Sequence, residues 1–161
     1  ARDAGAAAGR ENPLTGWLRA LGVWGCGAHA KHVPAPVFQL PRAQLALFLN
    51  RLFATDGWAT VLASGQPQVG YSTVSEQLAR QVQHLLLRFG VVASLRERAI
   101  RYRDGRRTAW QLDVTDAASL AAFAGAIGLF GKEEALARVE RALRGRRRQT
   151  NRDLVPVAVW D

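Results

Sequence analysis

The chain has 161 residues, 48% of them hydrophobic, which predicts one folded domain with its own core rather than a disordered basic tail. It carries 22 Lys and Arg against 13 Asp and Glu, a formal net charge of +9. That charge favours a polyanionic partner, nucleic acid before an anionic membrane; the alternative is a solvated basic surface. No run of about 18 apolar residues is present, which excludes a membrane-spanning helix. The single cysteine excludes an internal disulfide bond and fits a reducing compartment.

The first part of the chain predicts a short helix and then a linker. Asn12 and Pro13 have the residue types of an N-cap and a first helical position, and apolar residues at helical spacing continue to Gly22. Residues 22–41 hold three glycines and three prolines, more than a helix tolerates, and are predicted to be a linker. Residues 1–11 are rich in Ala and Gly, and the chain has no methionine, which favours a segment of a longer polypeptide.

From residue 42 the predicted order is helix, hairpin, helix, hairpin, helix, helix. The first of these helices, residues 42–53, is apolar on nearly every side, which predicts a helix buried between layers. The later elements are expected at residues 58–64 and 68–74, a helix begun by a Thr73–Glu76 capping box, residues 91–103 and 106–114, and helices at 116–127 and 132–144. These patterns predict an α+β fold, with one four-stranded antiparallel sheet, helices on one face, and the other face left for a partner.

An internal repeat accompanies these elements. Ala-Leu-Gly-Val-Trp-Gly at residues 20–25 echoes Ala-Ile-Gly-Leu-Phe-Gly at residues 126–131, and a lysine, Lys31 or Lys132, follows each copy. Each copy ends a predicted amphipathic helix. A duplication explains the shared context better than chance, so the chain is expected to hold the tail of one repeat and all of a second.

Two patterns suggest metal ligands. Asp56 ends the apolar helix, where the helix dipole disfavours a carboxylate, so a bound cation such as Mg²⁺ would explain its position; the alternative is a simple Asp-Gly turn. Cys26, His29 and His32 have a spacing that suits zinc, but a structural zinc site wants a fourth ligand, and ordinary loop residues are the alternative.

The hairpins carry the side chains that are candidates for reading DNA. Arg and Gln contact bases through two hydrogen bonds, and a two-stranded ribbon fits the major groove. The candidates in the first hairpin are Gln66, Gln68, Tyr71, Ser72 and Thr73, and those in the second are Arg96, Arg98, Arg101, Arg103, Arg106, Arg107 and Gln111. A sheet face so rich in Arg favours DNA contact over a role in solubility alone.

Three blocks resemble the LAGLIDADG homing endonucleases that are carried inside inteins. Residues 49–57, Leu-Asn-Arg-Leu-Phe-Ala-Thr-Asp-Gly, resemble the motif that names the family. Residues 31–34, Lys-His-Val-Pro, resemble the Lys-x-Ile-Pro block before the second motif, and residues 84–91 resemble the Leu-rich block. The likeness is strongest to inteins of bacterial replicative helicases and polymerases and covers roughly residues 12–161.

The resemblance implies an αββαββα repeat used twice, whose two motif helices pack together and each send one acid to the DNA backbone. It implies metal-dependent hydrolysis of double-stranded DNA, with Asp56 and the Thr55 carbonyl binding Mg²⁺, Mn²⁺ being possible as well. Lys31 and Lys132 resemble the basic residues that flank the two scissile phosphates. The resemblance also implies a location in the bacterial cytoplasm.

The resemblance also divides the chain. Residues 1–40 are expected to be the tail of the first repeat and a linker, 41–144 the second repeat, and 145–161 a basic segment leading back to the splicing domain. The first motif and its acid are absent from these residues, so this fragment is expected to be inactive alone. Arg51 departs from the small residue that the family favours in the helix pair. The alternatives are a DNA-binding module that has lost cleavage and a structural insert of an intein.

Overall fold

The computed structural model describes residues 12–102 and 105–144, so the predicted segment 145–161 and Arg103 lie outside the described residues. The elements in chain order are α1 (Pro13–Ala20), the 3-10 helices η1 (Ala28–Ala30) and η2 (Ala35–Gln39), α2 (Arg42–Asp56), β1 (Gly57–Val61), β2 (Pro67–Thr73), α3 (Glu76–Leu87), β3 (Ser94–Tyr102), β4 (Gly105–Val114), α4 (Ala117–Ala126) and α5 (Glu133–Arg144). The predicted order of helices and hairpins is confirmed, with α2 running three residues further than expected, to Asp56.

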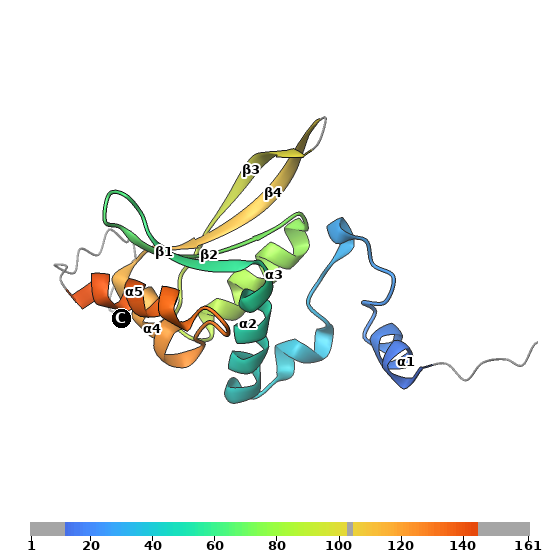
Figure 1. The fold of residues 1–161 in the computed structure, drawn as a ribbon. Coiled ribbons are helices and arrows are strands. Elements are labelled where there is room, and N and C mark those ends of the chain that lie inside the picture. Colours follow the sequence, from blue (N-terminus) through green and yellow to red (C-terminus); the bar gives the residue numbers. More distant parts are fainter. Residues whose placement is uncertain (1–11, 103–104, 145–161) are drawn as a thin grey trace, which may run out of the picture.

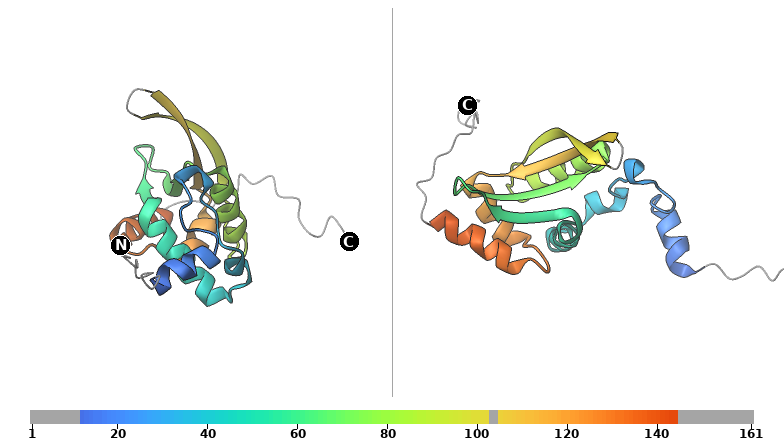
Figure 2. Two further views of the ribbon diagram at one scale, coloured as in Figure 1. Left: turned by 90° about the vertical axis from the view of Figure 1, so that its right-hand side faces the viewer. Right: turned by 45° about the horizontal axis from the view of Figure 1, so that its top comes forward.

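The four strands form one antiparallel sheet in the order β1-β2-β4-β3, as predicted. Helices α2 to α5 lie on one side of it, and the β3–β4 hairpin extends beyond them (Figures 1 and 2). Because side chains alternate between the two faces of a strand, the buried Val69 and Tyr71 of β2 and Leu112 and Val114 of β4 face the helices. The other face, which we call the open face, carries the side chains between them.

The core lies between the sheet and α2, α3, α4 and α5. Helix α2 buries Leu45, Leu49 and Phe53, and the Phe53 ring lies 5.0 Å from that of Phe123 on α4. The expectation that α2 is buried on all sides is wrong, since the Leu47 side chain is 55% exposed. The helical period places Leu47 on a different face of α2 from Leu45, Leu49 and Phe53. Only the face with these three buried residues packs against the rest of the domain.

The start of α3 also differs from the prediction. The N-cap is Ser75, whose hydroxyl accepts a hydrogen bond from Leu78 N at 3.1 Å. Thr73 instead accepts from Ser75 N at 3.2 Å, too early in the chain to cap the helix. The Ser75 hydroxyl also donates to the carbonyl of Lys31 at 2.6 Å, so the cap ties the preceding segment to α3.

The segment from residue 31 to 41, predicted as part of a linker, is fixed along α3. Val33 is buried, and its N–H donates to the Gln81 side chain at 2.7 Å. The guanidinium of Arg88 donates to the carbonyls of Phe38 and Leu40, both at 3.0 Å. Side chains of α3 and of the residue that ends it therefore satisfy backbone groups that a free linker would leave to water.

The internal repeat is visible in the backbone. Gly22 and Gly128 have φ values of 74° and 72°, and Gly25 and Gly131 have 76° and 72°. This left-handed conformation strains any residue with a Cβ, which explains why both copies keep glycine there. The two copies are thus the same helix-ending turn, built twice.

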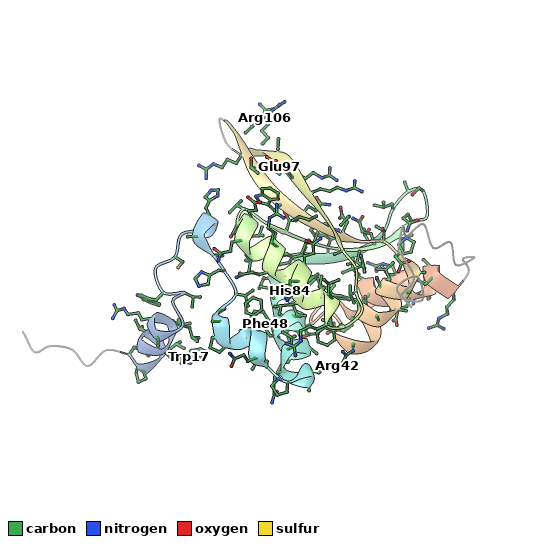
Figure 3. All side chains as sticks on the ribbon, turned by 180° about the vertical axis from the view of Figure 1, so that it is seen from behind. Trp17, Arg42, Phe48, His84, Glu97 and Arg106 are labelled. Carbon is green, nitrogen blue, oxygen red and sulfur yellow. The ribbon has the colours of Figure 1, made fainter. Side chains whose placement is uncertain are left out.

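The two copies differ in how far the helix before each turn is buried. At the offset of 106 residues, Leu14 and Trp17 correspond to Leu120 and Phe123. Leu120 and Phe123 are fully buried, whereas Leu14 and Trp17 are 58% and 59% exposed. Figure 3 shows Trp17 on α1, apart from the helices that cover the sheet. Helix α1 therefore has the apolar residues of α4 but, within the residues that the structure describes, covers no sheet.

Gly70 is required by a close approach across the sheet. It pairs with Trp58, and a Cβ built on Gly70 would lie 2.2 Å from Cζ2 of the indole ring. We expect Gly70→Ala to lower the free energy of unfolding by about 1–3 kcal/mol, as overpacking does. Urea denaturation measures this change. Trp58→Ala made in the same chain should recover part of the loss, and a purely additive double variant would contradict this account.

Candidate nucleic-acid interface

Asp56 lies at the last turn of α2, directly before the first strand. Gly57 N donates to the Phe53 carbonyl and ends the helix, and a Cβ at Gly57 would lie 2.6 Å from that carbonyl oxygen. The Asp56 carboxylate is exposed, with the Thr55 hydroxyl 3.4 Å from its Oδ2. A negative charge next to the carbonyl end of a helix is unfavourable by itself.

Lys132 reaches the start of β1, directly after Asp56, from the turn before α5. Its ammonium donates to the Gly57 carbonyl at 2.5 Å, one residue after Asp56. The turn that carries Lys132 is held on α2, because Asn50 donates to the Ile127 carbonyl at 2.9 Å. The predicted Lys132 therefore binds the residue that follows Asp56, although 76 positions separate it from Asp56 in the sequence. Within the described residues no ion pair joins the two side chains.

Arg51, adjacent to Asn50 on α2, also contacts this turn. Its guanidinium lies over the ring of Phe130, 3.6 Å from the ring centre. The N–H of Gly131 donates to the Glu133 carboxylate at 2.8 Å. Hydrogen bonds from the Glu133 and Gly131 backbone lower the pKa of Glu133, and the charge of Arg51 adds to this. The sequence patterns place Phe130 in the internal repeat but do not predict that it or Glu133 contacts Arg51 on α2, because that contact joins distant parts of the chain.

Lys31 lies in a different place from Lys132. Its carbonyl is bound by Ser75 at the N-terminus of α3, and its side chain is exposed. Within residues 12–102 and 105–144, no hydrogen bond or ion pair joins Lys31 to Asp56. The structure therefore brings one of the two predicted lysines, Lys132, to the backbone directly after Asp56.

Tyr71 is not available to a partner on the open face, contrary to the prediction. It pairs with Gly57 in the sheet, is 1% exposed, and packs its ring 5.2 Å from that of Phe53. Burial raises the pKa of its phenol, and the nearby charge of Asp56 raises it further. Thr73, two residues further along β2, lies on the same face of the sheet as Tyr71, toward the helices.

The remaining candidates divide between the two faces by the strand register. Ser72, Gln111 and Arg96 are aligned across β2, β4 and β3 on the open face. Arg98 and Arg107 follow on the same face toward the hairpin tip, whereas Arg101 and Arg106 are exposed on the opposite side of the hairpin. Figure 3 shows Arg106 close to the tip. Gln66, in the β1–β2 turn, donates to the Thr115 carbonyl at 3.0 Å.

The most buried polar group of the open face is one that the sequence patterns did not single out. Asp113 is 5% exposed and accepts hydrogen bonds from the side-chain amides of Gln68 and Gln111. Gln68 is itself only 9% exposed, so its amide supports Asp113 rather than facing solvent. The sequence could have indicated Asp113, because it follows Gln111 by two residues and therefore lies on the same face of the strand.

The donor groups at Asp56 fit a magnesium ion better than zinc. Mg²⁺ takes one or two carboxylates and completes its shell with water and phosphate oxygens, which one exposed carboxylate at a helix end allows. In the described part of the chain, no three His, Cys, Asp or Glu side chains gather to hold a metal. Cys26 instead donates to the Gly22 carbonyl at 3.3 Å, and His32 Nδ1 lies 3.2 Å from the Ala30 carbonyl oxygen.

The fold is that of a LAGLIDADG-like domain. Residues 43–128, more than half of the chain, match the model of the LAGLIDADG-like domain. The chain belongs to this family. None of the helices among the described residues is long and apolar enough to cross a membrane.

Similar segments occur in bacterial proteins with different names. The chain is 39% identical over 158 residues to the replicative DNA helicase DnaB of Rhodothermus marinus, across 96% of this chain and 17% of that protein. It is 29% identical to the protein RecA of Mycobacterium tuberculosis, across 87% of this chain and 20% of RecA. It is 38% identical to a DNA gyrase subunit of Mycobacterium gordonae, across 71% of this chain and 20% of that protein. The chain thus spans a fifth or less of each of these relatives.

Proposed function

We propose that the chain is the second catalytic half of a site-specific double-strand DNA endonuclease carried by an intein. The observation that carries the proposal is that Lys132 binds the backbone next to Asp56. Its ammonium donates to the carbonyl of Gly57, the residue after an exposed carboxylate, at the end of an apolar helix that joins a sheet with an open basic face. Hydrolysis of a phosphodiester needs both a site for a cation and positive charge near the phosphate.

The comparisons support the intein part of the proposal. The same segment matches parts of a helicase, of RecA and of DNA gyrase, and in each case leaves about four fifths of that protein unmatched. A segment that recurs inside differently named proteins is best explained as an insertion that moves between them. We therefore infer an intein, with a splicing domain in the same precursor.

The open face supports binding to duplex DNA. Arg96, Arg98 and Arg107 lie there on a long two-stranded hairpin, a shape that fits the major groove. The net charge of +9 adds an attraction that does not depend on base sequence. Gln111 and Ser72, aligned with Arg96, offer hydrogen-bonding groups to base edges.

Asp56 and the main-chain carbonyl of Thr55 would hold Mg²⁺, or Mn²⁺ with the same ligands, at a phosphate. The ion, when bound, would neutralise charge on the phosphate oxygens. Lys132 would add a positive charge to the same phosphate, while its bond to the Gly57 carbonyl holds its ammonium at the residue after Asp56. We assign Lys31 to the other active site, next to the acid of a first repeat.

The exposed face of α2 supports pairing with the helix of that first repeat. A pocket along it is lined by Gln44, Leu47, Phe48, Arg51, Leu52 and Thr55. These residues recur every three or four positions and lead to Asp56, so a helix packed there would bring its own end close to that acid. The Arg51 guanidinium lies over the ring of Phe130, a contact that holds its charge against the turn before α5. The exposed Leu14 and Trp17 of α1 would cover the first repeat's sheet.

The alternative function is sequence-specific binding without cleavage. Arg51, a bulky charged residue in the pairing face, favours this alternative if its contact with Phe130 breaks when the helices meet. Binding is common to both functions, whereas cleavage by a protein with both repeats separates them.

Binding through the open face is tested with a triple variant and a matched double variant. We expect Arg96→Ala, Arg98→Ala and Arg107→Ala together to lower the slope of log affinity against log salt by about 2 to 3, because each phosphate contact contributes about 0.9. Fluorescence anisotropy with duplex DNA between about 50 and 200 mM salt measures this slope. Arg101→Ala with Arg106→Ala is the control on the opposite side and should change the slope less per arginine. Salt-insensitive affinity, or no affinity at low salt, contradicts DNA binding.

A further inference from the structure

Three polar side chains form a small network on the open face. Gln68 on β2 and Gln111 on β4 both donate from Nε2 to Oδ1 of Asp113, the second at 2.7 Å. Within the described residues, no Lys or Arg forms an ion pair with this buried carboxylate. Neutral amides thus satisfy a charge that would otherwise be expensive to bury, in a protein with a large excess of basic residues.

The network fixes which way the two amides point. An ionised carboxylate can only accept hydrogen bonds, whereas an amide has a donor end and an acceptor end. Each glutamine must therefore turn its NH₂ group to Asp113, which leaves the carbonyl oxygen, Oε1, directed elsewhere. Gln68 is too buried to contact a partner, but Gln111 is half-buried and lies between Ser72 and Arg96 on the open face.

We propose that Asp113 is a positioning residue that makes Gln111 a hydrogen-bond acceptor toward DNA, so that Gln111 selects a base with an exocyclic amino group. This proposal rests on the proposed function, because it requires a duplex on the open face. Adenine N6 and cytosine N4 are the donors in the major groove, while guanine O6 and N7 and thymine O4 only accept there. Adenine fits best, since its N7 can also accept the second N–H of the Gln111 amide.

The test is selection of duplexes from a randomised library by the 161-residue chain and its variants. We expect the unaltered chain to select adenine, or less often cytosine, at one position, and Gln111→Leu to lose that preference. Asp113→Asn should lose it too, because an asparagine can donate as well as accept and lets the Gln111 amide turn over. Affinity for duplexes that lack the selected base should stay within about threefold, since the phosphate contacts remain. Glu140→Gln, an exposed position on α5 away from the open face, is the control and should keep the preference.

A second measurement needs no variant of Asp113. Replacing the selected base by its analogue without the exocyclic amino group should weaken binding of the unaltered chain about tenfold. No loss with this analogue overturns the proposal even if Asp113→Asn fails to fold. An Asp113→Asn variant that keeps the preference lost in Gln111→Leu also overturns it, as does a Gln111→Leu variant that loses none. If the unaltered chain binds no duplex at low salt, the proposed function fails and this proposal fails with it.

Discussion

Replacing Asp56 by Asn is expected to abolish DNA cleavage by a protein that joins this chain to a first repeat. An amide binds Mg²⁺ less well than a carboxylate, and losing several kcal/mol of charge stabilisation at the phosphate slows the reaction by about a thousandfold or more. DNA affinity should persist or rise slightly, because a negative charge near phosphate is removed. Single-turnover cleavage with Mg²⁺ and anisotropy without metal measure the two effects separately.

The matched control for this change is Glu140→Gln on α5, which removes one exposed carboxylate elsewhere in the domain. It should leave the cleavage rate unchanged. If Asp56 only shapes the turn before Trp58, Asp56→Asn will also cut at the normal rate, since Asn suits turns almost as well as Asp. That result would remove the catalytic assignment and leave the family membership as a likeness of fold.

Leu47→Asp is expected to disrupt the pairing of the two repeats without unfolding this one. Leu47 is 55% exposed in this chain, so the free energy of unfolding of the chain alone should change by less than about 0.5 kcal/mol. In a protein with both repeats, the same aspartate would be buried without a partner in the helix pair, at about 3 kcal/mol or more. Double-strand cleavage should then fall at least about a hundredfold.

Thermal unfolding of the chain and plasmid cleavage by the two-repeat protein measure these effects. Leu47→Ala is the control and should reduce cleavage far less, because it removes contacts without burying a charge. The unaltered chain by itself should leave a supercoiled plasmid uncut, since it carries one motif acid. Full cleavage by the Leu47→Asp protein would show that this face of α2 does not pair, and linear product from the chain alone would mean that it pairs with a second copy of itself.

Local chemistry determined much of this protein from sequence alone. Asn12 and Pro13 begin α1 as predicted, because capping and proline geometry act within one turn, and the Asn12 side chain accepts from Leu14 N at 2.9 Å. The order of helices and hairpins from residue 42 follows from hydrophobic period and turn residues in the same way. The family motif also lies within a short stretch, at the end of α2, and the match over residues 43–128 confirms it.

Only the tertiary structure decided which face each residue takes. Tyr71 and Ser72 are neighbours of similar polarity, yet one is buried against Phe53 and the other lies on the open face. A shift of one residue in strand register exchanges the two faces, and the register depends on partners far away in the chain. The same holds for Lys132 at Gly57 and for the two glutamines at Asp113, because these contacts join residues from different elements. Spacing along the sequence does not encode such contacts, since packing brings their partners together only when the domain folds.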